Sequence, residues 1–199
     1  MNNSFNTRDE WLTAAVNMLN TDVFEPAGIG CLNASWRIAC SFPGGGSARK
    51  RIGECWPSGS SDDKTREMFI SPLEDDPIEV LGIVAHEMIH AIDDCVNGHR
   101  GPFRTMALAI GLEGPMKSTT SGPKLTATLE TMATRLGSYP HAKINLHGRK
   151  KQSTRMVKIE CLDDTSKGCK CILRGARSTL LSAGLPTCGC GSMMTAEIG

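Results

Sequence analysis

The chain has 199 residues, of which 40% are hydrophobic and 22% charged, and these proportions are ordinary for a folded globular protein rather than a disordered one. It contains no apolar run of 18 residues, so we expect no membrane partner. The polar first ten residues lack the apolar core of a secretory signal. These features predict a cytoplasmic protein.

The net charge of +1 is unevenly distributed. Residues 1–140 carry 12 Lys and Arg against 17 Asp and Glu, whereas residues 141–199 carry 10 against 4. A basic tail on an acidic body favours a polyanionic partner for the tail, and the alternative is a solvated basic surface.

The N-terminal part predicts a helix followed by a small sheet. Thr7 and Glu10 have the spacing of a capping box, and apolar residues recur on one helical face from Trp11 to Leu19. Three short β-like stretches follow and predict a small antiparallel sheet. The expected strands are 35–42, 51–56 and 67–70.

Three further helices are expected. Asp76 is a good N-cap, Pro77 suits the first helical position, and Glu79 has capping-box spacing. The helix that they begin is apolar around much of its circumference and should be buried. The later helices are expected at 102–110, ended by Gly111, and at 124–136, ended by Gly137.

A polar, basic stretch at 147–151 predicts a domain boundary. We expect one domain over residues 1–146 and a second, cysteine-rich module with a basic linker over residues 147–199. The mixture of helices with a short sheet predicts an α+β fold.

The sequence His86-Glu87-Met88-Ile89-His90 is an HExxH motif on the helix expected to be buried. Two histidines four residues apart lie one turn apart on the same face, so both imidazoles can reach one zinc ion. Glu87 points off that line and is placed to take a proton from water. The alternative is a pair of core histidines satisfied by backbone carbonyls, which would leave a buried carboxylate without a role.

A catalytic zinc site needs a third protein ligand and one open position. His99 follows an Asn-Gly turn nine residues after His90, and it is the first candidate. Glu113 and Glu130 are weaker candidates, and His99 as a surface residue is the alternative. Asp93 and Val96 occupy the positions where a metzincin has glycine and histidine, so the chain is not a metzincin.

Five cysteines are crowded into the last 40 residues, and in a reducing compartment such a cluster favours a metal over disulfides. Four thiolates can bind a structural zinc ion in a tetrahedron. Basic residues surround them and could contact phosphates. The expected ligands are Cys161, Cys169, Cys188 and Cys190, with Cys171 as the alternative to Cys169, and the basic residues are Arg149, Lys150, Lys151, Arg155, Lys158, Arg174 and Arg177.

The scattered cysteines are expected to be structural. Cys31, Cys40 and Cys95 are predicted to be small buried side chains. Cys55, beside Trp56 in the expected sheet, is either a core thiol or a thiol close to the metal site.

Several motifs in order resemble the SprT-like (Spartan-type) zinc metallopeptidases, in particular the compact proteins of phages and some bacteria, and the resemblance covers about residues 8–195. Arg100 interrupts the Gly-His-Gly-Pro run of many relatives, and seven residues separate Cys161 from Cys169 where a tight Cys-x-x-Cys is usual. The motifs are His86–His90, Gly98-His99, Pro102-Phe103, residues 51–56, 69–72, Gly111-Leu112, residues 139–142 and the tail 184–191.

The resemblance implies a zincin-like core followed by a zinc ribbon, with one catalytic and one structural zinc ion. It implies His86, His90 and His99 as ligands and Glu87 as the catalytic residue. It also implies cleavage of DNA-bound proteins, single-stranded or damaged DNA as a partner of the tail, and the host cytoplasm as location if a phage encodes the chain. Tyr139 and His141 are candidates for oxyanion stabilisation. The alternative is a nucleic-acid-binding or transcription-associated zinc protein with latent or no protease activity.

Overall fold

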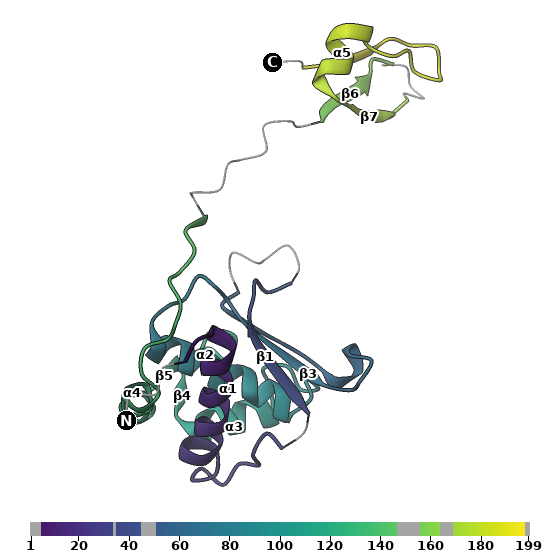
Figure 1. The fold of residues 1–199 in the computed structure, drawn as a ribbon. Coiled ribbons are helices and arrows are strands. Elements are labelled where there is room, and N and C mark those ends of the chain that lie inside the picture. The colour runs from purple at the N-terminus through teal and green to yellow at the C-terminus, as the bar shows by residue number, and fades with distance from the viewer. Residues whose placement is uncertain (1–4, 34, 45–50, 147–155, 164–168, 198–199) are drawn as a thin grey trace. The chain divides into compact units, whose positions relative to one another are not determined.

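A computed structural model describes residues 5–33, 35–44, 51–146, 156–163 and 169–197 (Figure 1). The chain divides into two compact units, residues 1–145 and 146–199. Helices and small sheets are mixed along the chain, as an α+β fold requires. In the described ranges, no helix is both long and apolar enough to cross a membrane.

Helix α1, Arg8–Leu19, begins with the predicted capping box. The Thr7 hydroxyl accepts a hydrogen bond from the Glu10 amide at 3.2 Å, and the Glu10 carboxylate accepts one from the Thr7 amide at 3.0 Å. The helix then continues as a π-helical turn, Asn20–Phe24, which the sequence did not predict. The buried face of α1 is the predicted one, from Trp11 to Leu19.

The first sheet consists of β1, Trp36–Cys40, β2, Gly53–Trp56, and β3, Arg66–Ile70, in the order β1-β3-β2. The prediction of an all-antiparallel sheet is wrong, because β1 runs parallel to β3 and only β2 is antiparallel to it. Alternation of apolar residues fixes which face of a strand is buried, but it does not fix the neighbour or its direction. Here β3 lies between β1 and β2, which are consecutive in the sequence.

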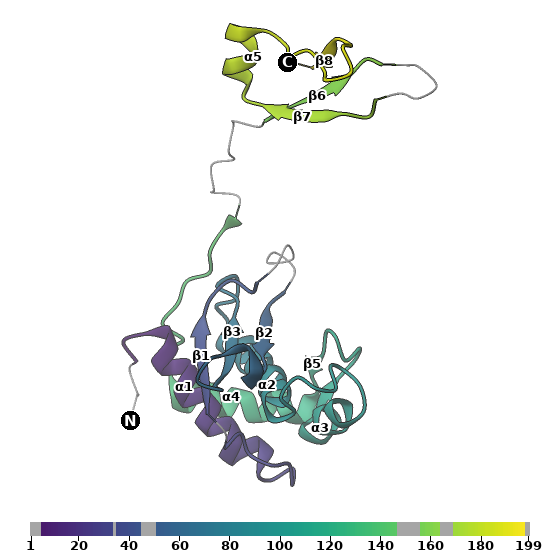
Figure 2. The same ribbon diagram turned by 90° about the vertical axis from the view of Figure 1, so that its right-hand side faces the viewer.

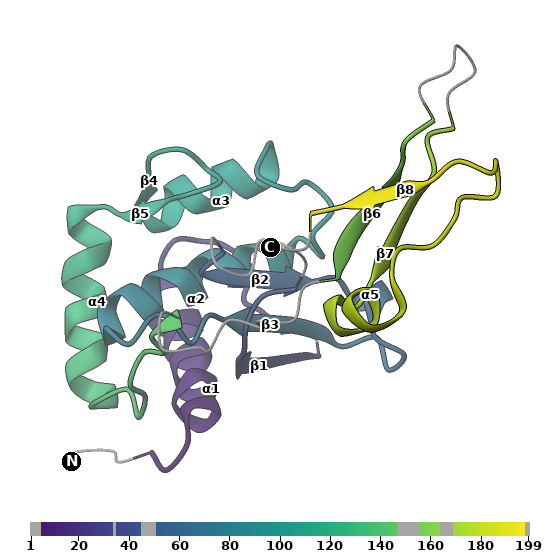
Figure 3. The same ribbon diagram turned by 90° about the horizontal axis from the view of Figure 1, so that it is seen from above.

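One face of this sheet packs against helices. Ile38, Met68 and Ile70 are buried on that face, which contacts α1 and helix α2, Pro77–Ile92. Helix α4, Pro123–Leu136, packs against both helices. On the other side of α2 from α1 lie the remaining elements of this unit (Figures 2 and 3). They are α3, Pro102–Ile110, and the hairpin of β4, Leu112–Glu113, with β5, Thr120–Ser121.

The ends of α2 and α3 follow the predicted local chemistry. The Asp76 carboxylate accepts hydrogen bonds from the amides of Ile78 and Glu79 at 2.9 and 3.0 Å, which confirms Asp76 as the N-cap. The Glu79 side chain lines a cavity instead, so only the Asp76 half of the predicted capping box is seen. Gly111 ends α3 at a φ of +90°, where a side chain would be strained.

The second unit contains an antiparallel sheet of order β7-β6-β8 and helix α5, Arg177–Ala183. Its described buried core is small, and it consists of Ile159, Leu180, Cys188 and Met194. So small a core gives little hydrophobic stabilisation, so the unit needs another source of stability. The strands are β6, Val157–Cys161, β7, Ile172–Gly175, and β8, Met194–Ala196.

Removal of the α2 cap should destabilise the larger unit. We expect Asp76→Ala to lower the free energy of unfolding by about 1 kcal/mol, because two amides in the first turn of α2 lose their acceptor. Urea unfolding of the full chain measures this change. Asp62→Ala, at an exposed position, is the control, and equal midpoints for the two variants would contradict a capping role.

Candidate functional site

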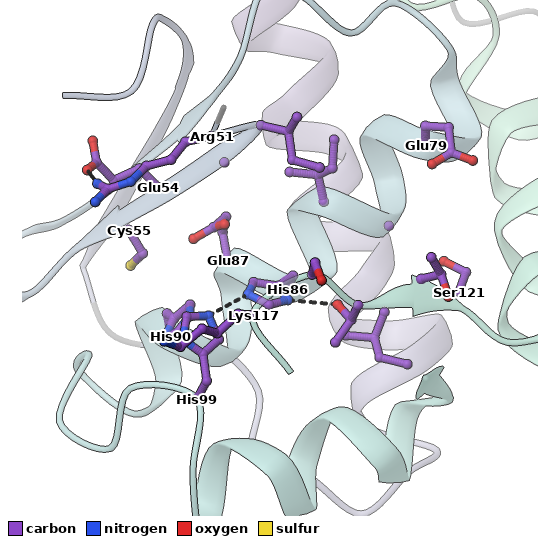
Figure 4. Close-up of a pocket in the computed structure, with 18 of the residues that line it drawn as sticks. Arg51, Glu54, Cys55, Glu79, His86, Glu87, His90, His99, Lys117 and Ser121 are labelled. Carbon is purple, nitrogen blue, oxygen red and sulfur yellow. Dashed lines mark hydrogen bonds and ion pairs between the residues drawn. The ribbon is translucent and has the colours of Figure 1, made fainter. Parts of the chain in front are cut away.

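Three histidine side chains converge beside helix α2 (Figure 4). His86 and His90 come from α2, and His99 comes from the segment between α2 and α3. The Nε2 atom of His99 lies 3.3 Å from Nε2 of His86 and 3.2 Å from Nε2 of His90. The structure therefore brings together the two motif histidines and the first candidate for the third ligand.

These separations suit a shared metal ion. Three nitrogens bonded at ~2.05 Å to one tetrahedral ion lie ~3.3 Å from one another. The observed 3.2 and 3.3 Å match that spacing. The three side chains can therefore hold one metal ion with a fourth position left for another ligand.

Two neighbours orient this histidine group. The Thr119 hydroxyl lies 2.9 Å from Nδ1 of His86, so the opposite ring nitrogen is left to face the group. The buried Phe103 ring contacts all three imidazoles: it is tilted by 31° against His90 with centroids 4.4 Å apart, and it meets His86 and His99 edge-on at 5.0 Å. Sequence reasoning missed Thr119 because it lies in a Ser- and Thr-rich loop 33 residues beyond His86.

The histidines are neutral near pH 7 without a metal. Burial, reinforced by the charges of the other two histidines, lowers the pKa of His86 to about 3. Burial and the neighbouring His99 lower the pKa of His90 to about 4. Burial and then Lys117 also lower the pKa of His99. A neutral imidazole keeps the lone pair that a metal ion requires.

Glu87 is a buried carboxylate beside this group, with 6% of its surface exposed. Burial, followed by the charges of Cys95 and Glu54, raises its pKa to about 8. Its Oε1 atom approaches strand β2 so closely that a Cβ at Gly53 would lie 2.4 Å from it. Only a residue without a side chain fits there, and this packing holds the carboxylate in place.

A cavity of about 580 Å³ contains His86, Glu87 and the other histidines in its lining. One wall comes from β2 and the residues before it, where Arg51 forms an ion pair with Glu54 at 2.5 Å. The opposite wall comes from residues 117–121 of the hairpin. Figure 4 shows Glu79 and Ser121 at one end and Glu54 with Arg51 at the other. The cavity is thus an open, charged cleft across α2.

Four residues considered from the sequence lie away from this cavity. Glu113 and Glu130 are exposed and belong to neither group of candidate metal ligands among the described residues. Tyr139 packs on Trp11 with ring centroids 4.9 Å apart, and Nε2 of His141 lies 2.9 Å from the Pro72 carbonyl. Tyr139 and His141 are therefore wrong candidates for oxyanion stabilisation, because they pack near α1 and the loop after β3.

A second group of candidate ligands lies in the other unit. Sγ of Cys161 is 3.5 Å from Sγ of Cys190, and Sγ of Cys169 is 3.6 Å from Sγ of Cys188. Four thiolates bonded at ~2.3 Å to one tetrahedral ion are ~3.8 Å apart, so the cluster needs little adjustment. Cys171 lies outside this group.

A tight turn places two of these thiols. The Gly191 amide donates to the Cys188 carbonyl at 2.9 Å, and Gly191 has a φ of +89° that favours glycine. Hydrogen bonds from the Ser192 side chain and backbone lower the pKa of Cys190 to about 6. A thiolate is the form that binds metals.

The expected basic residues are only partly described. Lys158 and Arg174 are cross-strand neighbours on the exposed face of β6 and β7, and Arg177 begins α5. Lys158 also forms an ion pair with Glu160 at 2.5 Å. The other four, Arg149, Lys150, Lys151 and Arg155, lie outside the described residues.

The scattered cysteines differ from expectation. Cys31 is only half-buried, and its thiol donates to the Glu25 carboxylate at 3.4 Å. Cys40 packs on the edge of the core. Cys55 and Cys95 both line the cavity, so Cys95 is not a core residue. The sequence did not predict that Cys55 and Cys95 lie close together, because they are 40 positions apart.

Comparison of the chain with protein-family models, curated proteins and solved structures found no match in any of the three.

Each ligand group should hold one metal ion. We expect two bound ions per wild-type chain and one in a His86→Ala, His90→Ala double variant, because the cysteine group is left intact. Elemental analysis of dialysed protein measures the ratio. A matched Cys188→Ser, Cys190→Ser variant should instead keep the histidine-bound ion, and two ions persisting in the first variant would refute the ligand assignment.

Strand β2 approaches Glu87 so closely that we expect no side chain to fit at Gly53. A Cβ there would also lie 2.8 Å from Cγ2 of Ile83, so we expect Gly53→Ala to destabilise the fold by about 1–3 kcal/mol through overpacking. Urea unfolding measures the loss. Gly59→Ala is the matched control because nothing lies within 4 Å of its Cβ position, and similar stability of both variants would count against the constraint.

Proposed function

We propose that this chain is a zinc-dependent endopeptidase of the SprT-like type. The observation that carries the proposal is the convergence of three imidazole nitrogens beside a buried glutamate in an open cleft. In this proposal, residues 1–146 form the zincin-like peptidase domain. Residues 147–199 form a basic linker and a zinc-ribbon module.

The two donor sets support zinc as the metal. Three histidines with one open position are typical of a catalytic zinc site, and four cysteines are typical of a structural one. The alternatives that prefer oxygen ligands, such as magnesium and calcium, do not suit either set. When bound, zinc supplies a Lewis acid that polarises a peptide carbonyl and makes water more acidic.

Glu87 is the proposed general base. It follows His86 directly on α2, so its side chain leaves the helix about 100° away from the ligand face. From there the carboxylate accepts a proton from the attacking water and passes it to the departing amine. A nearby divalent cation favours the ionised form of the carboxylate and so opposes the effect of burial on its pKa.

The free edge of β2 is the proposed binding site for the peptide. β2 is an edge strand of its sheet, and residues 51–55 line the cleft beside His86 and Glu87. An extended peptide can pair with such an edge through main-chain hydrogen bonds. In this proposal, the peptide carbonyl to be cleaved lies over α2, between β2 and the hairpin wall.

DNA-associated proteins are the proposed substrates, with single-stranded or damaged DNA bound by the tail. The excess of basic residues in 141–199 supports this partner, as do Lys158 and Arg174, which lie side by side on an exposed sheet face. Binding of DNA and protein by one chain would raise the local concentration of the substrate near the cleft.

Glu87→Gln tests the proposed role of the base. We expect the variant to retain both metal ions and to lose cleavage by at least about a hundredfold, because the amide cannot accept the proton. Cleavage of a basic DNA-binding protein is measured with and without single-stranded DNA. Glu130→Gln, exposed on α4, is the control and should cleave like the wild type.

Two outcomes would count against the peptidase. Equal cleavage by Glu87→Gln and wild type would remove Glu87 from the mechanism. Wild-type protein that binds two zinc ions and DNA but cleaves nothing would favour the rival function, a nucleic-acid-binding zinc protein.

A further inference from the structure

Two thiols that the proposed reaction does not use meet in the wall of the cleft. Cys55 lies on β2, and Cys95 lies in the segment that joins α2 to α3. Both line the cavity that contains Glu87. The Sγ atom of Cys95 lies 3.5 Å from the backbone carbonyl oxygen of Cys55. Residues 40 positions apart in the sequence therefore form one local pair.

The position of Cys55 follows from strand alternation. Gly53 faces α2, because a Cβ there would touch Glu87. Residues two apart on a strand share a face, so Cys55 also points towards α2. Figure 4 shows its sulfur directed into the space beside Glu87. The thiol is thus on the cleft side of the sheet.

The position of Cys95 is held by an unusual backbone. Asp94 and Cys95 have φ values of +51° and +59°, which non-glycine residues seldom adopt and which usually reflect a local constraint. The Cys95 amide donates to the His90 carbonyl at 2.8 Å. The Asp94 carboxylate accepts two hydrogen bonds from Ser58, each of 2.8 Å, and pairs with Arg66 at 3.1 Å. These contacts direct the Cys95 side chain towards β2.

Each of the two thiols also shifts the pKa of the other. Contact with the Cys95 thiol is the largest cause that raises the pKa of Cys55, and contact with the Cys55 thiol is the largest cause that lowers the pKa of Cys95. Cys31 and Cys40 do not share this arrangement, since Cys31 bonds to Glu25 and Cys40 packs on the core. Four of the five cysteines in the other unit form their own thiol group.

We propose that Cys55 and Cys95 form an oxidation site that reacts with hydroperoxides to give a reversible disulfide. One thiolate attacks the peroxide oxygen, which gives a sulfenic acid and releases water or an alcohol. The second thiol then attacks the sulfenic sulfur, and the S–S bond forms as a second water leaves. With hydrogen peroxide, two thiols and one peroxide give one disulfide and two waters.

The disulfide closes the cleft to substrate. It ties the edge strand β2 to the segment between His90 and His99, so β2 cannot shift to widen the cleft around a peptide. It also alters the cleft surface beside Glu87. This consequence rests on the proposed peptidase function, whereas formation of the disulfide does not.

The first test maps the oxidised cysteines. Full-length, zinc-loaded protein is treated with hydrogen peroxide, digested, and analysed by mass spectrometry without reduction. We expect a linked Cys55–Cys95 peptide, about 2 Da lighter than the two reduced peptides together, which dithiothreitol removes. Cys55→Ser and Cys95→Ser should each lose it, and Cys31→Ser, the matched control, should keep it. Absence of the linked peptide in wild type would overturn the proposal, even if a variant failed to fold.

The second test measures cleavage before and after peroxide. Wild type should lose most of its activity and recover it with dithiothreitol, while Cys55→Ser and Cys95→Ser should resist. Zinc released during treatment is monitored, so that damage to the cysteine group is recognised. A linked peptide with unchanged cleavage would overturn the closure of the cleft. If wild type never cleaves, the peptidase function fails, and peptide mapping still decides the oxidation site.

Discussion

Burial of polar groups on helix α2 is the constraint on which the rest of the site depends. The helix is packed against β2, β3 and three other helices, and yet it carries Glu87 and His90 at buried positions. Such groups are costly to remove from water unless each finds a partner. His99, from the segment after α2, and Phe103, from α3, approach this helix. In the proposed function, a metal ion bound by the histidines is the partner of these buried groups.

A bound metal ion would contribute differently to the stability of the two units. The histidine group lies on a scaffold with an extensive apolar core, so its geometry is held by packing that does not involve the ligands. The second unit has few buried apolar residues, and its candidate ligands include one of them, Cys188. A metal bound there would contribute directly to folding, as in small zinc modules.

The mixed sheet bears on function through its edge. Because β3 occupies the centre, β2 is an edge strand among the described residues, and residues 53–55 of that strand line the cleft. Gly53 allows the strand to approach Glu87, and Cys55 follows two residues later on the same face. The proposed peptide-binding edge and the proposed oxidation site therefore share a few residues of one strand, beside Glu87 on α2.

Local periodicity and capping were enough to predict the starts of α1 and α2, the bounds of α3 and α4 to within a residue, and the placement of His86 and His90 on one face of a helix. Only the tertiary structure decided the strand order, the approach of His99, and the contacts of Thr119, Gly53 and the Cys55–Cys95 pair. These contacts join residues that are far apart in the chain. Packing and shape select the partner of each residue, and no local sequence pattern predicts it. The same limit explains why Tyr139 and His141, which were candidates from the sequence, pack away from the cleft.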